Sequence, residues 1–445
     1  MRVAIITESY PPDVNGVANS VVRIAEHLVL RGHEPLVIAP RSSQTARAVA
    51  GPCPYPVARI TSVPLPGYRA FRLGLPTPRL TGALVEHAPD VVHLASPVVL
   101  GARGASVARY LGLPMVAVFQ TDLPAYARAY GVGSGATIAW RWLRAIHNRA
   151  DRTLAPSRAT ATALMAQGIE RVWLWGRGVD TTRFHPAKRS AALRRAVAPG
   201  GQLIVGYVGR LAVEKRVDLL ARVCRQPDVR VLVVGAGPMR AHLERVLPGA
   251  VFLGERHGEQ LARIYASLDV FAHTGPHETF GQTVQEALAS GVPVVAPACG
   301  GPLDLVTPGR TGVLVPPDDT RAFADAVAAL AADRELVRRY ATAARDSVAA
   351  RTWAAVGDEL IGHYGAIVGT GTAGRVPDHA DMTRATAVSG ADGTAAGCRI
   401  DAIASTPSTS RGPGRTTMPS ASMAHTCAPG NRCATDRACS LAPSR

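Results

Sequence analysis

The feature that most constrains the fold is a unit of apolar strand, glycine-bearing loop, helix and second apolar strand. Its first copy has a strand over 2–7, a loop that ends in Asn15-Gly16, a helix over 17–31 and a strand over 36–39. Apolar residues recur along the helix at the spacing of one buried face. Units of this kind build parallel sheets with helices on both sides. The sequence therefore predicts a doubly wound α/β fold.

The same unit returns near the middle of the chain. A strand over 203–208 leads into the loop Gly209-Arg210, and a helix over 216–224 and a strand over 229–234 follow. With 445 residues, the chain is long enough for two domains of ordinary size. We expect a first Rossmann-like domain over 1–176, a linker over 177–202, a second Rossmann-like domain over 203–352, a C-terminal helix over 353–369 that packs back on the first domain, and a tail over 370–445.

Composition separates the tail from the rest and indicates the compartment. Beyond residue 369 the chain is rich in Ala, Thr, Ser, Gly and Pro without helical or strand period, so we expect disorder. The seven cysteines are scattered and form no C-x-x-C pair, which is typical of a reducing compartment. The N-terminus turns polar at Thr7, too early for a signal peptide, and no apolar run approaches the roughly 20 residues of a spanning helix. These features predict a cytoplasmic protein.

The charge of the chain leaves several partners open. A net charge of +16 permits nucleic acid, an anionic membrane or anionic ligands. Residues 35–85 contain no acid but six arginines, interleaved with Leu, Tyr and Phe, and the predicted helix over 136–150 carries the run W-R-W-L-R. Both stretches suit an anionic lipid surface. Solvated arginines remain the alternative for each. The six arginines are Arg41, Arg47, Arg59, Arg69, Arg72 and Arg79.

The candidate site lies around two glutamates eight residues apart. Glu278 is in a loop after the predicted strand 270–272, and Glu286 is inside a helix predicted to run from Gly281 to Gly291. The N-terminus of that helix suits a phosphate or diphosphate. Carboxylates accept hydrogen bonds from sugar hydroxyls. The arrangement suggests sugar, diphosphate and ribose held in one row, and a surface helix with solvated acids is the alternative.

A second glycine pattern, Gly235-Ala-Gly237, invites a nicotinamide-cofactor interpretation. It does not complete the dinucleotide fingerprint, because Arg240 stands where the third glycine belongs and Pro238 follows the second. The sequence therefore argues against a dehydrogenase.

Several motifs together resemble the family-4 retaining glycosyltransferases of the GT-B fold. They are V-N-G-V-A-N-S-V (14–21), F-Q-T-D (119–122), G-V-D-T-T-R-F (178–184), G-R-L-A-V-E-K (209–215) and H-E-T-F-G-Q-T-V-Q-E-A-L-A-S-G (277–291). Within that family the motifs resemble the GDP-mannose-dependent α-mannosyltransferases that build lipid-anchored mannosides. The resemblance implies two Rossmann-like domains facing a central cleft, with the acceptor on the side of the first domain and the nucleotide sugar on the second.

The resemblance also implies roles for individual residues. Arg210 and Lys215 bind the donor diphosphate, where two cations would stabilise the charge that develops on the leaving phosphate. Glu278 lies at the transferred sugar and Glu286 holds the ribose hydroxyls. The remaining expected substrate-binding residues are Asn15 and Gly16 in the N-terminal loop, Phe280 and Gly281 in the Glu278 motif, and Arg256 near the base.

One position departs from the family pattern. Many members have a histidine where this chain has Gln120, which can hydrogen-bond to a sugar hydroxyl but cannot titrate. Asp122 is the candidate for orienting the acceptor, with a strand-end cap as the alternative. The chain has no D-x-D motif, and the family generally works without a catalytic metal, so we expect neither metal nor cofactor.

The expected function is thus transfer of α-mannose from GDP-mannose to a lipid-linked acceptor, of the glucuronosyl diacylglycerol or phosphatidylinositol mannoside type. We expect a peripheral enzyme at the inner face of the plasma membrane that binds no nucleic acid. Two alternatives stay open: the same fold with a UDP-sugar donor, and a non-catalytic basic protein that binds nucleic acid. The second alternative leaves both glycine loops and both glutamates unexplained.

Overall fold

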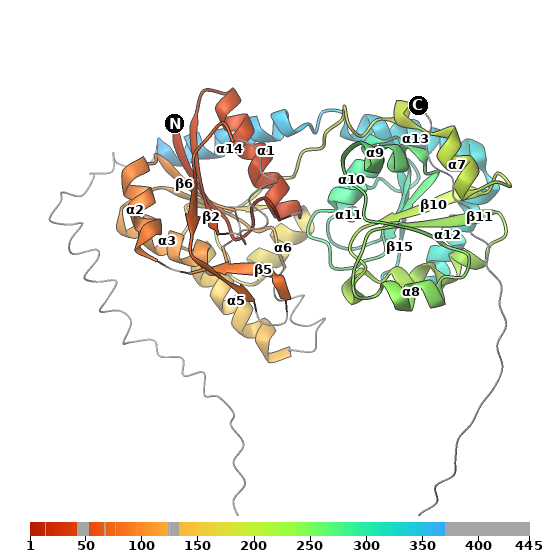
Figure 1. Ribbon diagram of the computed structural model, residues 1–445, viewed down its shortest axis with the longest axis horizontal. Coiled ribbons are helices and arrows are strands. Elements are labelled where there is room, and N and C mark those ends of the chain that lie inside the picture. The colour runs from red at the N-terminus through yellow and green to blue at the C-terminus, as the bar shows by residue number, and fades with distance from the viewer. Residues whose placement is uncertain are drawn as a thin grey trace, which may run out of the picture. The chain divides into compact units, whose positions relative to one another are not determined.

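The computed structural model describes residues 1–369, apart from positions 14, 42–52, 66–67, 76, 96, 123 and 125–132. The tail predicted over 370–445 lies outside the described residues. The described chain contains two parallel sheets, each with helices on its faces (Figure 1). The predicted fold class, α/β with two Rossmann-like domains, is confirmed.

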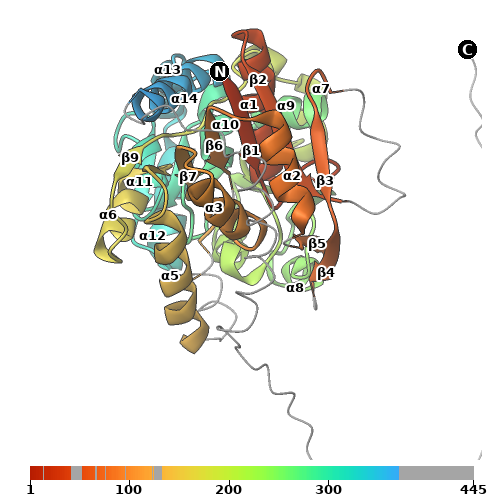
Figure 2. The ribbon, with the colours of Figure 1, turned by 90° about the vertical axis from the view of Figure 1, so that its left-hand side faces the viewer.

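The first sheet has seven strands in the order β3-β2-β1-β6-β7-β8-β9, all parallel. Apart from Arg2 and the buried His93, its inner strands β1, β6 and β7 are apolar and buried, because helices cover both faces. Figure 2 shows α2 and α3 side by side along this sheet. The elements are β1 (Arg2–Ile6), α1 (Gly16–Leu30), β2 (Glu34–Pro40), β3 (Val57–Ile60), α2 (Pro78–His87), β6 (Val91–Leu94), α3 (Leu100–Tyr110), β7 (Met115–Val118), α5 (Gly133–His147), β8 (Arg152–Ala155), α6 (Arg158–Ala166) and β9 (Val172–Leu174).

The second sheet has six parallel strands in the order β12-β11-β10-β13-β14-β15. Its strand order reverses between β10 and β13, which makes this position the topological switch point. The elements are β10 (Leu203–Val208), η3 (Val213–Lys215), η4 (Val217–Ala221), η5 (Val223–Arg225), β11 (Val229–Val234), α8 (Arg240–Val246), β12 (Val251–Gly254), α9 (Gly258–Ser267), β13 (Val270–Ala272), α10 (Gln282–Ala289), β14 (Val294–Pro297), α11 (Pro302–Leu305), β15 (Gly312–Val315), α12 (Thr320–Ala332) and α13 (Arg334–Val348).

The last described helix, α14 (Trp353–Val368), packs on the first sheet. Its buried side chains Leu360 and Tyr364 share a core with Val21 and Ile24 of α1. At the surface, Asp358 accepts a hydrogen bond from Arg31 Nε at 2.7 Å. The chain therefore passes through the second sheet and then contributes a helix to the core of the first.

Three segments differ from the sequence prediction. The helix predicted over 216–224 is wrong. Arg216 adopts a left-handed conformation (φ +48°) between η3 and η4, and the rest of the segment forms the short 3₁₀ turns η4 and η5. An antiparallel hairpin, β4 (Ser62–Leu65) and β5 (Tyr68–Gly74), was not predicted. The segment predicted as a linker contains η2 (Pro186–Lys188) and α7 (Ala191–Val197), and Phe184 and Val197 lie in a core of the second sheet. The domain boundaries themselves stay a prediction.

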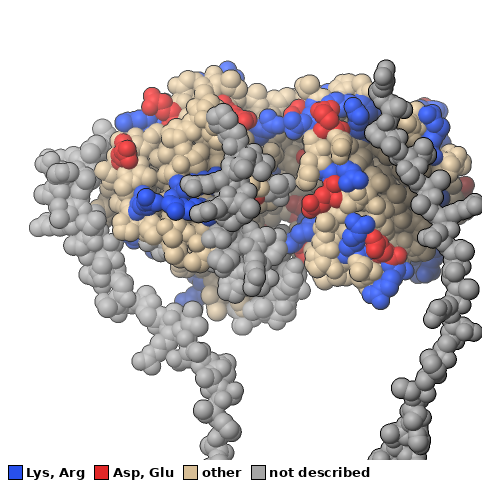
Figure 3. Space-filling view, viewed as in Figure 1, with Lys and Arg blue, Asp and Glu red and all other residues tan. Residues whose placement is uncertain are grey.

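The surface bears on the possible partners. Basic and acidic side chains lie next to one another on the right-hand part of the face shown in Figure 3, whereas most of the left-hand part that is visible is uncharged. None of the helices in the described part of the chain is both long and apolar enough to cross a bilayer. Arg59, one of the arginines of the predicted basic stretch, donates to the carbonyls of Pro11 and Pro40 and lies over the Tyr10 ring, so this guanidinium stabilises the local fold.

Candidate active site

Two loops meet at the switch point of the second sheet. The first follows β10 and carries Arg210 and Lys215, and the second follows β13 and carries Glu278. The two loops are joined, because the side-chain hydroxyl of Thr274 donates to the Lys215 backbone carbonyl at 2.6 Å. Ligands of open parallel sheets bind at the carboxyl ends of the strands at such a point.

Lys215 and Glu278 form the centre of the site. Lys215 Nζ donates to Glu278 Oε2 at 3.0 Å, and both side chains are about four-fifths buried. Burial opposes ionisation of Glu278, but Lys215, His273 and Arg177 outweigh it and hold its pKa at about 2. Glu278 is therefore a carboxylate at any physiological pH and can accept hydrogen bonds from sugar hydroxyls.

Arg210 lies in the same group of charges but is paired with a different acid. Its Nη2 donates to Glu214, whose side chain is only 2% exposed. The Tyr207 hydroxyl donates to the Arg210 carbonyl at 2.9 Å. Burial raises the pKa of this hydroxyl, which is also affected by four nearby charges, those of Lys215, Glu278, Glu214 and Arg210. The structure thus brings both predicted diphosphate-binding cations to one place and gives each a carboxylate partner.

Glycines fix the backbone of the Glu278 loop. The Gly301 N–H donates to the Glu278 carbonyl at 2.8 Å. A Cβ on Gly300 would lie 2.4 Å from that carbonyl oxygen, and Gly300 has a φ of +62°. Gly281, the N-cap of α10, has a φ of +98°. The sequence prediction that α10 begins after Gly281 is confirmed, and the helix N-terminus directly follows the loop that carries Glu278.

Glu286 lies on α10 among groups other than those around Glu278. Burial raises its pKa to about 7, and Tyr265, Gln282 and Arg183 counteract this rise only in part. The two glutamates thus differ in protonation behaviour although they belong to one motif.

The predicted residues of the first domain lie close to Arg177, which was not predicted as a site residue. Gly16 begins α1, and its carbonyl accepts a hydrogen bond from Arg177 Nη1 at 3.2 Å. Gln120, beyond the end of β7, accepts one from Arg177 Nη2. Asn15 caps α1 by accepting hydrogen bonds from the N–H groups of Val17 and Ala18, both at 3.0 Å. The only sequence signal for Arg177 was its position next to the motif G-V-D-T-T-R-F.

Three further predicted residues lie elsewhere. Asp122 is partly buried two residues after Gln120, and its role in orienting the acceptor stays a prediction. Arg256 donates to the carbonyl of Glu255 at 2.7 Å, at the end of β12. Phe280 is 4% exposed and its side chain packs in the hydrophobic core, while its contact with substrate stays a prediction.

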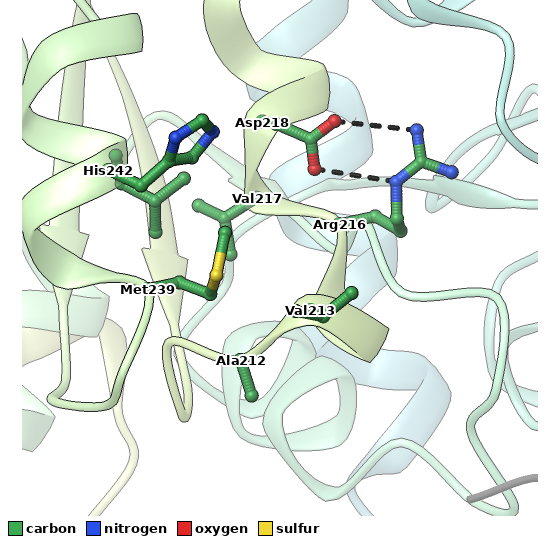
Figure 4. A pocket seen from close by; sticks show the side chains of 8 residues that line it. Ala212, Val213, Arg216, Val217, Asp218, Met239 and His242 are labelled. Atoms are coloured by element: carbon green, nitrogen blue, oxygen red, sulfur yellow. Dashed lines mark hydrogen bonds and ion pairs between the residues drawn. The ribbon is translucent and has the colours of Figure 1, made fainter. Parts of the chain in front are cut away.

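A cavity of about 220 Å³ lies beside the Lys215 loop. Figure 4 shows its lining, with Val213, Val217 and Met239 around the space and Arg216 paired with Asp218 at one side. Neither Lys215 nor Glu278 lines it, and it is smaller than the roughly 300–1,000 Å³ of most ligand pockets. We therefore do not assign the donor to it. No group of three or more potential metal-ligating side chains occurs within the described ranges.

Two Rossmann-like sheets, with cations and a carboxylate at the switch point of the second, define the GT-B class of glycosyltransferases. Two family models match: Glycosyltransferase Family 4 over residues 14–183, and Glycosyl transferases group 1 over residues 202–333. The chain is 52% identical over 377 residues to a GDP-mannose-dependent alpha-mannosyltransferase of Mycobacterium tuberculosis, covering 84% of this chain and 98% of that protein.

A protein of the same name from Mycolicibacterium smegmatis is 53% identical over 373 residues, covering 83% of this chain and 98% of the relative. The fold is shared with Anabaena Alr3699/HepE, solved in complex with UDP, with a TM-score of 0.68 at 21% identity over 82% of this chain and 100% of that one. The chain belongs to glycosyltransferase family 4 and is a glycosyltransferase.

Proposed function

We propose that this enzyme transfers α-mannose from GDP-mannose to a lipid-linked acceptor, with retention of configuration at the sugar. The observation that carries the proposal is that the likeness to mannosyltransferases extends through both domains and includes the Lys215 and Glu278 loops. The donor assignment rests on this likeness, and the geometry of the site supports a nucleotide sugar as the substrate class.

The proposed chemistry uses the charges at the switch point. When the bond between sugar and phosphate breaks, negative charge develops on the leaving phosphate, and Lys215, Arg210 and the N-terminus of α10 stabilise it. Glu278 holds hydroxyls of the transferred sugar, and the leaving phosphate takes the proton of the acceptor hydroxyl on the same face. We propose that these residues suffice without a metal, so activity should survive excess chelator.

The proposed acceptor is a membrane glycolipid of the glucuronosyl diacylglycerol or phosphatidylinositol mannoside type, reached from the cytoplasmic face. The α5 helix supports this location. It carries no acidic residue, and its exposed side includes Ile138 (68% exposed), Trp142 (49% exposed), Arg141 and Arg144. Apolar and basic side chains on one helix face suit an anionic lipid surface.

A thermal-shift titration tests the donor. A ligand that binds only the folded state raises the melting temperature. We expect GDP to raise it more than UDP or ADP at the same concentration, and radiolabelled GDP-mannose to label a lipid in membrane extracts. A larger shift with UDP would contradict the proposed donor, and label appearing only in water-soluble products would contradict the lipid acceptor.

Vesicle sedimentation tests the membrane surface. The double variant Arg141→Glu, Arg144→Glu should bind vesicles containing phosphatidylglycerol at least about tenfold more weakly, because each basic residue near an anionic surface contributes about 1 kcal/mol. The pair Arg321→Glu, Arg338→Glu on the second domain is the matched control and should bind as the wild type does. Equal loss in both pairs would show that net charge alone governs binding.

A further inference from the structure

Arg177 is a buried cation at the junction of several elements. Its side chain and backbone are together only 8% exposed. Gln285 of α10 donates to its carbonyl at 3.0 Å, and the neighbouring Val179 bridges to Thr352. The backbone at Arg177 is therefore fixed, and with it the Cα from which the side chain extends.

Two neighbours fix the guanidinium in turn. Gln120 Nε2 donates to the carbonyl of Ala95 at 2.9 Å, which leaves Gln120 Oε1 to accept from Arg177. Gly16 accepts through its carbonyl, and a Cβ at Gly16 would lie 2.7 Å from Arg177 Nη1. Each polar atom of Gln120 thus makes one hydrogen bond, and through its oxygen Gln120 positions Arg177. One amide N–H and one lone pair of Oε1 remain, so a contact with a sugar hydroxyl stays a prediction.

The charge of Arg177 has no partner at ion-pair distance. Among the described residues, no carboxylate oxygen lies within 4.0 Å of its nitrogens, whereas Arg210 and Lys215 are each paired with a glutamate. The negative charge of Glu278 acts on the Arg177 guanidinium, but Glu278 Oε2 accepts its hydrogen bond from Lys215 Nζ. A buried charge without a partner is strongly unfavourable in a folded protein. Buried ionisable groups of this kind cluster at functional sites.

The guanidinium still has donors to offer. It has five N–H groups, of which two are used by Gly16 and Gln120, so three have no partner among the described residues. Planar paired N–H groups match the oxygens of carboxylates and phosphates. We propose that Arg177 is an oxyanion-binding residue of the active site, held by Gln120 and Gly16, and that it takes an anionic oxygen of a substrate.

Two sources supply such an oxygen: a phosphate of the donor, or an acid group of the acceptor. The inference rests on the proposed function for the identity of both substrates. It does not depend on which nucleotide is bound, because either nucleoside diphosphate offers the same phosphate oxygens.

Three variants and a control test the inference. Arg177→Gln removes the charge, and Arg177→Lys keeps the charge without the paired geometry. Gln120→Glu keeps the guanidinium and gives it a carboxylate partner, which remains informative if Arg177→Gln does not fold. Arg321→Lys, at an exposed position of α12, is the control. For each variant we would measure the dissociation constant of GDP and of UDP by calorimetry, and the KM of the lipid acceptor.

If Arg177 binds a donor phosphate, Arg177→Gln and Gln120→Glu should each raise the dissociation constant of GDP at least about tenfold. Arg177→Lys should then recover part of the GDP affinity. An acid group of the acceptor predicts the same change in acceptor KM with unchanged GDP affinity. Wild-type affinity and wild-type KM in Arg177→Gln, or in Gln120→Glu alone if the former is unfolded, would overturn the inference. A wild-type enzyme that binds UDP and not GDP would instead overturn the proposed donor.

Discussion

At the scale of single residues, the site holds two glutamates of one motif in opposite states. Lys215, His273 and Arg177 overcome burial at Glu278 and hold its pKa at about 2, whereas burial dominates at Glu286 and raises its pKa to about 7. Pairs of acids whose surroundings separate their pKa values in this way have separate roles. Glu278 is a permanent carboxylate next to a cation, and Glu286 changes charge near neutrality.

The ion pair at the centre gives the first prediction. Glu278→Gln keeps the size of the side chain but removes the charge that faces Lys215, and we expect at least about a hundredfold lower kcat, the scale of losing one preorganised electrostatic group. Lys215→Ala should lower kcat by a similar factor. Initial rates with GDP-mannose and circular dichroism spectra of both variants would check this. Turnover near that of the wild type in both folded variants would show that the pair takes no part in transfer.

The raised pKa of Glu286 predicts a pH-dependent donor affinity. If its carboxylate accepts hydrogen bonds from the ribose hydroxyls, donor binding favours the ionised form. That form predominates above pH 7 and is lost as the pH falls below 7. We expect the dissociation constant of GDP-mannose to rise about fivefold between pH 7 and 6, and to approach a tenfold rise per pH unit below pH 6. Glu286→Gln should bind more weakly at pH 8 and show no such slope, and a slope that persists in this variant would assign the pH dependence to another group.

At the scale of elements, local chemistry decided what the sequence could predict. The bounds of α10 were predictable because Gly281 and Gly291 require left-handed backbone at its two ends. The helix over 216–224 was not, because no local signal marks the left-handed backbone of Arg216, whose guanidinium pairs with Asp218 and the distant Asp318. Arg177 was missed for a similar reason. Its partners, Gly16 and Gln120, lie far away in sequence, so the neighbouring motif G-V-D-T-T-R-F was the only local signal for it.

The glycine loop under Glu278 gives a prediction about an element. Gly300→Ala places a Cβ 2.4 Å from the Glu278 carbonyl oxygen, and Gly309→Ala meets its nearest atom, the Tyr340 hydroxyl, at 4.0 Å. Both glycines have positive φ, so both changes cost about 1 kcal/mol of strain. Gly300→Ala should lower the free energy of unfolding by about 1–3 kcal/mol more than Gly309→Ala does, because the backbone at Glu278 must move to make room for the Cβ. This movement should also lower activity. Denaturant unfolding of the pair would check this, and equal stabilities would contradict the close approach.

At the scale of the whole molecule, the described chain has separate cores in its two sheets, and the last helix belongs to the first. Leu360 and Tyr364 of α14 lie in a cluster with residues of β1 and α1. Leu330 of α12 lies in a cluster made entirely of second-sheet elements. The first core is therefore completed by residues that follow the second domain in sequence. A truncated chain that ends near residue 176 would lack part of this core.

This arrangement predicts where single core substitutions act. Leu360→Ala and Leu330→Ala remove equally buried leucines, each 1% exposed, and each should cost about 2–5 kcal/mol. Since the cores are separate, we expect Leu360→Ala to lower the temperature of the calorimetric unfolding transition of the first domain. Leu330→Ala should lower the transition temperature of the second domain. GDP should raise the transition temperature of the second domain, because Arg210, Lys215 and Glu286 all belong to that domain. If both variants lowered one common transition by the same amount, the two domains would unfold as a single cooperative unit, and α14 would be the element that couples them.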